Sequence, residues 1–246
     1  MNRAGGLSMT AATPPGMPRR RPEPLRQSDR AYAAIRRLII TCALRPGSSI
    51  SEPELSQRAR RNKAAVRAAL IRLSQERLVT PIPRQGYRVA PLTIRDAQNI
   101  LDLRVNLEPH AARHAAGRVS GGVFAPIRKQ FRAGYDPGKP RTVTAFLAAN
   151  KRFRVLIAEA TGNDRLAGII ATLVDELERY LRISLVPRNR SDQVLAGHEA
   201  LVEALVRGRA ADAETICRRQ MQSTRDMIMA ALLARDEILS QPLYQD

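Results

Sequence analysis

The sequence predicts a mainly α-helical protein, with an N-terminal winged helix-turn-helix that carries a small two-stranded wing and a C-terminal antiparallel all-helical bundle. Residues 32–93 read as three short helices followed by two short strands around a glycine turn. From Thr93 onward, apolar residues recur with the period of a helix and without the alternation of strands. The 246-residue chain has a formal net charge of +18, with 18 basic and 5 acidic side chains in residues 1–92 against 23 and 18 in the remainder. A basic N-terminal part followed by a C-terminal part of nearly balanced charge is typical of a polyanion-binding domain joined to a second module.

The first helix is expected over residues 28–43. Its apolar side chains fall on one face at helical spacing, and Pro46 with Gly47 then forces a turn. The residues of that apolar face are Tyr32, Ile35, Leu38, Ile39 and Cys42.

Capping patterns predict the next two helices. Ser51 and Glu54 form a capping box that starts a short helix ending near Ala59. Asn62 can cap a third helix over residues 63–77. The expected apolar stripe of that helix consists of Val66, Leu70 and Leu73.

Two strands, at residues 78–82 and 87–90, are expected to flank a turn at residues 83–86 and so to form a wing. In helix-turn-helix proteins the N-terminal end of the recognition helix meets base edges in the major groove. Arg and Lys can donate there to guanine or phosphate, while Asn62 can either pair with adenine or act as a helix cap. The candidate DNA-contacting residues are Asn62, Lys63, Arg67, Arg72, Arg84, Gln85 and Gly86.

The spacing over residues 32–93 has specific matches. They are Tyr32, Ile35, Leu44, Arg45, Pro46, Gly47, Ile50, Glu52, Leu55, Val66, Arg67, Ala69, Leu70, Leu73, Leu78, Val79 and Gly86. On these residues the segment resembles the winged helix-turn-helix of the GntR family of bacterial transcription regulators. Arg60 and Arg77 stand where the family usually has Gly, residues 62–65 replace its Ser-Arg-Thr-Pro, and Pro53 replaces an Arg that contacts DNA in many members. We therefore expect the fold of the family without assuming its base preferences.

The remaining chain divides into a basic, Pro- and Gly-rich tail at residues 1–27, expected to be disordered, and a second domain at residues 93–240. Cys42 and Cys217 lie in apolar helical contexts, which predicts buried thiols in a reducing compartment. We expect no membrane span and no signal peptide, hence a cytoplasmic protein. Helices of an antiparallel bundle are expected over residues 93–119, 121–135, 142–161, 163–185, 191–206 and 210–239.

The second domain has looser matches to a known module. They are Asp102, Leu103, Arg104, Leu107, Glu108, Phe153, Ala160, Gly162, Asn163, His198, Leu201, Ala204 and Leu205. On these residues the domain resembles the C-terminal FCD module of the FadR subfamily, an all-helical ligand-binding and dimerising domain. Many members bind a divalent metal there through one Asp and three His. Aligned on Phe153, those positions hold Asn150, Arg154, His198 and Gln220 in this chain. Because an Arg cation repels a metal ion, we predict no metal and no other cofactor.

A pocket for an anion could replace the metal. Arg104 lies within an apolar stripe, and Asn150 shares a helix face with Arg154. Arg on an apolar face is rarely buried without a partner. The candidate effector-binding residues, which could clamp a carboxylate or phosphate directly, are Arg104, Asn150, Arg154, His198 and Gln220.

Other interpretations of these side chains stay open. Arg104 can pair with Glu108 or Asp102, Arg154 can extend to solvent, and His198 can be an ordinary core residue. A degenerate sensor domain without a ligand is a third possibility.

The leading functional hypothesis is a homodimeric transcription regulator, acting as a repressor on the habit of the family. It would bind a near-palindromic operator and respond to a small acid effector. The alternative is a basic architectural protein that binds DNA or RNA without sequence selection or effector. We do not expect an enzyme, because the chain offers no nucleophile–base pair and no phosphate-cradling glycine loop. His110 and His114 have metal-like spacing, but no third ligand follows them.

Overall fold

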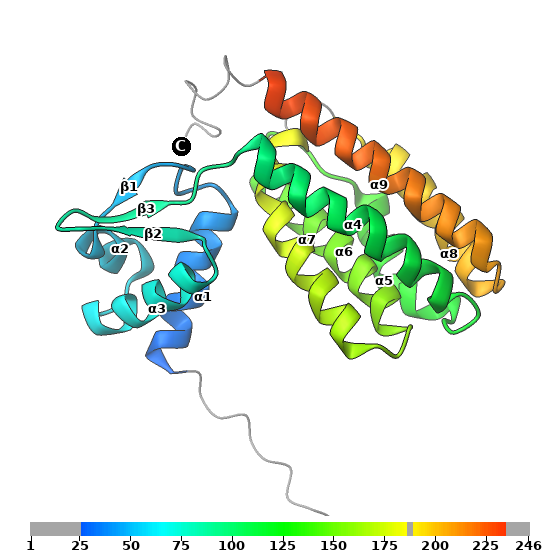
Figure 1. Ribbon diagram of the computed structural model, residues 1–246, viewed down its shortest axis with the longest axis horizontal. Coiled ribbons are helices and arrows are strands. Elements are labelled where there is room, and N and C mark those ends of the chain that lie inside the picture. Colours follow the sequence, from blue (N-terminus) through cyan, green and yellow to red (C-terminus); the bar gives the residue numbers. More distant parts are fainter. Residues whose placement is uncertain (1–25, 186–188, 235–246) are drawn as a thin grey trace, which may run out of the picture.

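The computed structural model describes residues 26–185 and 189–234 of the chain (Figure 1). Over these residues a small winged domain lies beside a larger helical bundle, as expected for a mainly α-helical fold. The predicted disordered tail falls almost wholly outside the described residues, although its last residue, Gln27, already belongs to the first helix. No helix in the described part of the chain has the length and apolar character needed to cross a bilayer.

The winged domain contains three helices and a three-stranded antiparallel sheet in the order β1-β3-β2. The sequence predicted only the two wing strands; β1 pairs with β3 through just two residues and is too short to show an alternating pattern. The elements are α1 (Gln27–Ile40), β1 (Ser49–Ile50), α2 (Glu52–Ala59), α3 (Lys63–Gln75), β2 (Val79–Ile82) and β3 (Gly86–Val89).

Both predicted helix caps are present. The Ser51 hydroxyl accepts a hydrogen bond from the Glu54 amide at 3.3 Å at the start of α2. The Asn62 side-chain oxygen accepts from the Ala65 amide at 2.9 Å at the start of α3. Each cap satisfies a backbone N–H that the first turn of a helix leaves without a partner.

Helices α1 and α3 end earlier than predicted, and for the same reason. Cys42 and Arg77 adopt left-handed backbone conformations, with φ of 57° at both residues, which stop the helices. The Leu78 amide then donates to the carbonyl of Leu73 at 2.9 Å, the closing bond of a Schellman motif. Neither residue is Gly, and the only sign of a stop is the Gly that the family usually has at the position of Arg77.

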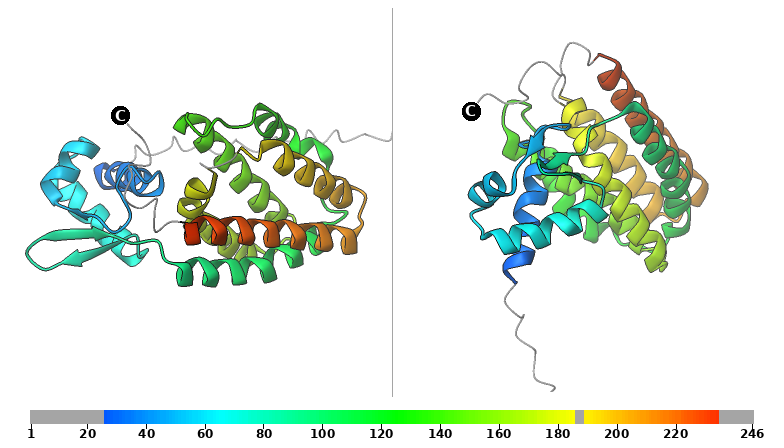
Figure 2. Two further views of the ribbon diagram at one scale, coloured as in Figure 1. Left: turned by 90° about the horizontal axis from the view of Figure 1, so that it is seen from above. Right: turned by 60° about the vertical axis from the view of Figure 1, so that its left-hand side comes forward.

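The helical domain is an antiparallel bundle in which α4 and α9 pack side by side along most of their lengths (Figures 1 and 2). Helix α4 begins at the predicted cap, where the Thr93 hydroxyl accepts from the Asp96 amide, and ends at Ala115, four residues earlier than expected. The weakly helical segment after it is split into a 3-10 turn and a helix. The elements are α4 (Ile94–Ala115), η1 (Gly121–Phe124), α5 (Ala125–Ala133), α6 (Pro140–Glu159), α7 (Asp164–Leu185), α8 (Ser191–Val206) and α9 (Ala210–Leu233).

Helix α7 is the part of the bundle that joins the winged domain. The Arg179 guanidinium donates to the carbonyl of Ala90 in the linker, and Arg36 of α1 donates to the carboxylate of Asp175 at 3.1 Å. The Tyr180 hydroxyl donates to Asp96 at 2.8 Å. A movement of α7 therefore acts directly on the linker and on α1.

Candidate functional site

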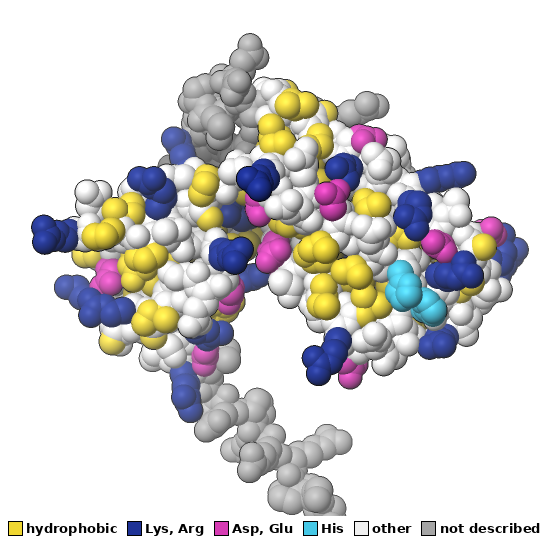
Figure 3. All heavy atoms as spheres, viewed as in Figure 1, with side chains coloured by type: hydrophobic (Ala, Val, Ile, Leu, Met, Phe, Trp, Pro, Cys, Tyr) yellow, Lys and Arg dark blue, Asp and Glu magenta, His cyan; other side chains and the backbone are white. Residues whose placement is uncertain are grey.

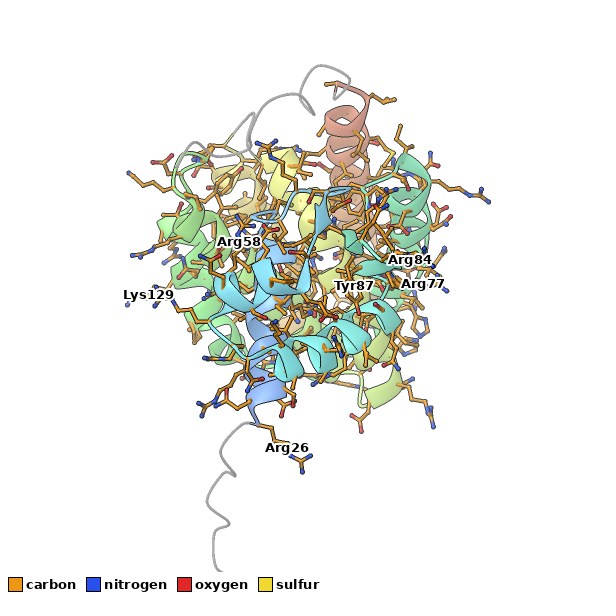
Figure 4. The ribbon with its side chains drawn as sticks, turned by 90° about the vertical axis from the view of Figure 1, so that its left-hand side faces the viewer. Arg26, Arg58, Arg77, Arg84, Tyr87 and Lys129 are labelled. Atoms are coloured by element: carbon orange, nitrogen blue, oxygen red, sulfur yellow. The ribbon has the colours of Figure 1, made fainter. Side chains whose placement is uncertain are left out.

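The exposed end of the winged domain carries many of its cations (Figure 3). Figure 4 looks onto this end, where Arg58, Arg77 and Arg84 are visible together with Tyr87. Arg84 occupies the turn of the wing with a φ of 62°, and both Arg84 and Gln85 are exposed. Lys63, at the first turn of α3, is also exposed, and its side chain makes no hydrogen bond or ion pair with any described residue. These side chains are accessible to an incoming polyanion.

Arg67 points outward from α3 but is held in position by α2. Its guanidinium makes a forked ion pair with Glu52, with Nη2–Oε2 and Nε–Oε1 distances of 2.9 and 3.2 Å. Hydrogen bonding to Glu52 raises the pKa of Arg67. The side chain remains 68 % exposed, and exposed ion pairs of this kind are weak and easily exchanged. Glu52 can therefore orient Arg67 without preventing it from contacting DNA.

Arg72 lies differently from the other candidates, because it turns back toward α1. It donates to Asp29 at 2.8 Å and stacks on the Tyr32 ring, with its guanidinium carbon 4.0 Å from the ring centroid. The Tyr32 hydroxyl in turn donates to Glu76 at 2.8 Å. These contacts give Arg72 a place in the packing of α1 against α3.

Two further candidates have clear roles in the fold. Gly86 has a φ of 106°, and a Cβ atom there would lie 2.6 Å from the carbonyl oxygen of Ile50. Gly is therefore needed for the close approach of β1 to the wing. Asn62 uses its side-chain oxygen as the cap of α3, the second of the two uses that the sequence allowed.

In the helical domain, all five candidate effector-binding residues line one cavity of about 320 Å³. Arg104 comes from α4, Asn150 and Arg154 from α6, His198 from α8 and Gln220 from α9. Apolar side chains complete the wall, among them Phe146, Leu147, Leu181, Val194, Ile216, Met221 and Met227. The cavity therefore combines polar and charged groups with apolar surface, as small-molecule sites do.

One carboxylate lies between two buried guanidinium groups beside this cavity. Glu108 forms an ion pair with Arg104 on its own helix, and its second oxygen lies 3.5 Å from Nε of Arg154. The three residues are 3 %, 1 % and 5 % exposed, respectively. The group carries one more positive than negative charge, and such an excess is costly away from water unless another anion is present.

These contacts decide between the open interpretations of the arginines. Arg104 does pair with Glu108, whereas Asp102 pairs with Arg225. The expectation that Arg154 could extend to solvent is wrong, because its guanidinium is enclosed by Glu108, His198 and Cys217. Burial raises the pKa of the Cys217 thiol to about 12, so this neutral group does not compensate the charge.

His198 is a neutral hydrogen-bonding group at the centre of the bundle. Its ring lies 4.1 Å from that of Phe153 and 4.4 Å from that of Phe131, between centroids. Burial, followed by the charge of Arg154, lowers the pKa of His198 well below its ordinary value. Nε2 lies 3.3 Å from Nη2 of Arg154, and a guanidinium can only donate. Nε2 therefore accepts, and the imidazole proton resides on Nδ1.

Several buried polar atoms around the cavity have no hydrogen-bond partner within the described residues. They include Nη1 of Arg104, Nδ1 of His198 and Oε1 of Gln220. The other end of the Gln220 amide donates to the carbonyl of Gly197 at 2.6 Å. Unsatisfied buried donors cost about 1–3 kcal/mol each, and more when charged. An anion in the cavity would supply acceptors for the Arg104 and His198 donors.

A divalent metal does not fit these residues. The Nε2 atom of His198 faces the Arg154 guanidinium, and Glu108 is already shared by two arginines. No three His, Cys, Asp or Glu side chains gather into a metal-binding group anywhere in residues 26–185 and 189–234. The His110 and His114 rings pack on each other at 4.3 Å between centroids without a further ligand.

Sequence reasoning missed three charged residues of this region. Glu108 was considered only as a local partner of Arg104, and its contact with Arg154 is formed between two helices. Arg190 and Arg219 also line the cavity. Arg219 directly precedes Gln220 on α9, and because adjacent residues of a helix do not share a face, the position of Gln220 gave no signal for it.

A winged helix-turn-helix joined to a helical domain with an internal cavity defines a class of ligand-responsive DNA-binding regulators. Residues 27–89 match the bacterial regulatory proteins of the gntR family, and residues 99–223 match the FCD domain. The chain therefore belongs to the GntR family of transcription regulators, in the group that carries an FCD domain. The matched families and relatives are transcription regulators and not enzymes.

Individual relatives agree with this assignment. An uncharacterized HTH-type transcriptional regulator in an unstable DNA locus of Streptomyces ambofaciens is 26 % identical over 201 residues, covering 80 % of this chain and 83 % of that protein. The HTH-type transcriptional repressor RspR of Escherichia coli K12 is 32 % identical over 89 residues, covering 36 % and 39 %.

Solved structures of distant sequence share the fold. A putative GntR transcriptional regulator from Rhodococcus sp. RHA1 superposes with a TM-score of 0.68 at 19 % identity, over 83 % of this chain and 98 % of that one. Escherichia coli McbR/YncC superposes with a TM-score of 0.70 at 18 % identity, over 84 % and 98 %.

Proposed function

We propose that this protein is a homodimeric, cytoplasmic repressor that binds a near-palindromic operator and is controlled by a small carboxylate- or phosphate-bearing metabolite in the helical domain. The observation that carries the effector hypothesis is the cavity, in which five polar residues from four helices converge around an excess of buried positive charge. The name of the Escherichia coli relative, a repressor, supports repression.

DNA recognition is assigned to the start of α3 and the tip of the wing. In a dimer, the two recognition helices would enter the major groove about one helical turn apart, which favours a palindromic operator. Lys63 and Arg67 are the candidates for base or phosphate contacts, and Arg84 and Gln85 are the candidates at the wing. Arg72 and Gly86 are expected to support the domain rather than to contact bases, because their geometry is fixed by contacts within the protein.

Helix α7 is the proposed connection between effector and DNA. Leu181 and Leu185 of this helix line the cavity, while Asp175 and Arg179 contact α1 and the linker. Asp175 also accepts from Lys151, the residue after Asn150 on α6. A ligand that displaces α6 or α7 would therefore change the position of the winged domain. The ligand would bind the protein more tightly in one position of the winged domain than in the other. The difference between these two affinities would set the change in operator affinity.

A selection against fragmented genomic DNA tests the DNA-binding part of this proposal. Purified protein is mixed with the fragments at near-physiological salt, and the retained fragments are sequenced. We expect one short palindrome to be enriched. Uniform retention of all fragments would contradict the proposal and favour the basic architectural protein, whose binding depends on charge alone.

Arg67→Ala supplies the residue-level test with the enriched fragment. Loss of a base-contacting arginine should weaken specific binding by about 10- to 100-fold, measured by fluorescence anisotropy, while circular dichroism stays unchanged. Arg72→Ala is the matched control on the same helix and should retain most of the affinity. Equal losses in the two variants would overturn the assignment of the DNA-facing side of α3.

A further inference from the structure

We infer that the cavity of the helical domain takes an elongated acid with an anionic group at each end. This inference rests on the proposed function, in which the cavity binds an acid, and goes further by naming the shape and charge of that acid. It depends on two separate positively charged groups along one cavity.

The inner group consists of Arg104 and Arg154. Both are buried and share the single carboxylate of Glu108. His198 beside them is neutral and carries an unpartnered Nδ1 proton. One anionic end group would balance the remaining positive charge and accept hydrogen bonds from donors that have no partner within the described residues.

The outer group is Arg190 with its neutral partners, and Arg190 also lines the cavity. Arg190 donates to the side-chain oxygen of Gln193 at 2.8 and 3.0 Å and to the Ser223 hydroxyl at 3.4 Å. Arg219 lines the cavity too, but it directly precedes Gln220, whose amide donates to Gly197 beside His198, so it lies at the level of the inner group. Among the described residues, the cavity lining contains four arginines and no Asp or Glu, so the positive charge of Arg190 is not compensated there.

The two groups are separated along the helices that carry them. His198 lies eight residues after Arg190 along α8, which corresponds to about 12 Å at the rise of an α-helix. On α9, Cys217 contacts Arg154 and Ser223 contacts Arg190, and their six-residue separation corresponds to about 9 Å. A simple anion such as acetate or phosphate is too short to reach both groups.

Apolar and polar side chains share the wall between the two groups. Val194 and Gln193 lie between Arg190 and His198 on α8, and Met221 and Gln220 lie between Cys217 and Ser223 on α9; all four line the cavity. A methylene chain can bury its surface against Val194 and Met221, so an aliphatic α,ω-diacid is a suitable probe for a ligand with two anionic ends.

The test compares a diacid with the monoacid of the same length by isothermal titration calorimetry on the full-length protein. Suberate should bind about tenfold or more tightly than octanoate, because only suberate can form a charge-assisted hydrogen bond with Arg190. In a chain-length series, affinity should be weakest for succinate and strongest for the diacids near suberate.

The single variant Arg190→Gln should remove the preference for suberate and leave octanoate affinity unchanged. Arg207→Gln is the control, since Arg207 is an exposed arginine beyond the end of α8 that does not line the cavity; it should keep the preference.

Equal binding of the two acids to the unmodified protein would overturn the two-ended ligand while leaving acid binding in the cavity intact. A suberate preference that survives in Arg190→Gln would overturn the assignment of Arg190 as the outer cation. Absence of binding by either acid would overturn both this inference and the proposed effector site.

Discussion

Arginines of the winged domain and arginines of the helical bundle have opposite surroundings. In the winged domain, Arg67 pairs with Glu52 at the surface and keeps most of its area in contact with water. In the bundle, Arg104 and Arg154 are almost completely buried around one carboxylate. Water already stabilises the exposed charge of Arg67, so a polyanion can bind it by replacing water and Glu52 as its partners. The buried charge of Arg104 and Arg154 depends on an anion inside the protein, the carboxylate of Glu108.

The largest effect on stability is expected when the carboxylates that pair with these arginines are replaced. Glu108→Gln leaves two buried guanidinium groups without an anion and should lower the free energy of unfolding by about 3 kcal/mol or more. Glu52→Gln removes the partner of an exposed arginine and should change the midpoint of urea unfolding only slightly. Urea denaturation followed by circular dichroism measures both. Equal destabilisation by the two substitutions would show that the buried arginines do not rely on Glu108.

The difference between the two regions also explains what the sequence could and could not predict. Helix starts were predictable because a cap lies next to the helix that it begins, as Ser51, Asn62 and Thr93 do. The early end of α1 was not, because Cys42 adopts a left-handed conformation that its side chain does not indicate. The end of α3 was indicated only by the Gly that the family usually has at the position of Arg77.

Contacts between residues far apart in the sequence limited the prediction of the sites in the same way. The alignment on Phe153 gave positions that do line one cavity. The link between Glu108 and Arg154 joins two helices, and Arg72 reaches Asp29 across 43 residues of sequence. Helical periodicity describes one element at a time and carries no information on such pairs.

The next effect concerns the pH dependence of stability. His198 is neutral in the folded protein because burial and Arg154 lower its pKa well below the ordinary 6.5. As pH falls below 6.5, the unfolded chain binds a proton at His198 that the folded protein does not, so stability falls. The contribution of this residue is about 1.4 kcal/mol per pH unit until the pKa of the folded state is reached.

His198→Gln keeps an acceptor for Arg154 and removes the titration. Urea unfolding at pH 7.5 and at pH 5.5 should therefore show a smaller loss of stability in this variant than in the unmodified protein. His110→Gln is the control on the exposed face of α4 and should retain the full loss. If the two variants showed the same pH dependence, His198 would not be the buried neutral group that the bundle requires.

The smallest expected effect separates the charge of an exposed arginine from its backbone conformation. Arg60 ends α2 in the left-handed region, with a φ of 52°, where a Cβ atom costs about 1–2 kcal/mol. Glycine removes that strain but loses more backbone entropy on folding, by about 0.5–1 kcal/mol. The net effect of Arg60→Gly should be a small gain, below about 1 kcal/mol.

Arg58→Gly, two residues earlier inside the helix, removes the same charge and should instead lower stability by a similar amount. A rise in melting temperature for Arg60→Gly and a fall for Arg58→Gly would show that Arg60 occupies a position better suited to Gly. A loss of operator affinity in Arg60→Gly would assign the charge of Arg60 to a phosphate contact. Equal destabilisation by the two variants would instead mean that the left-handed conformation of Arg60 carries no strain.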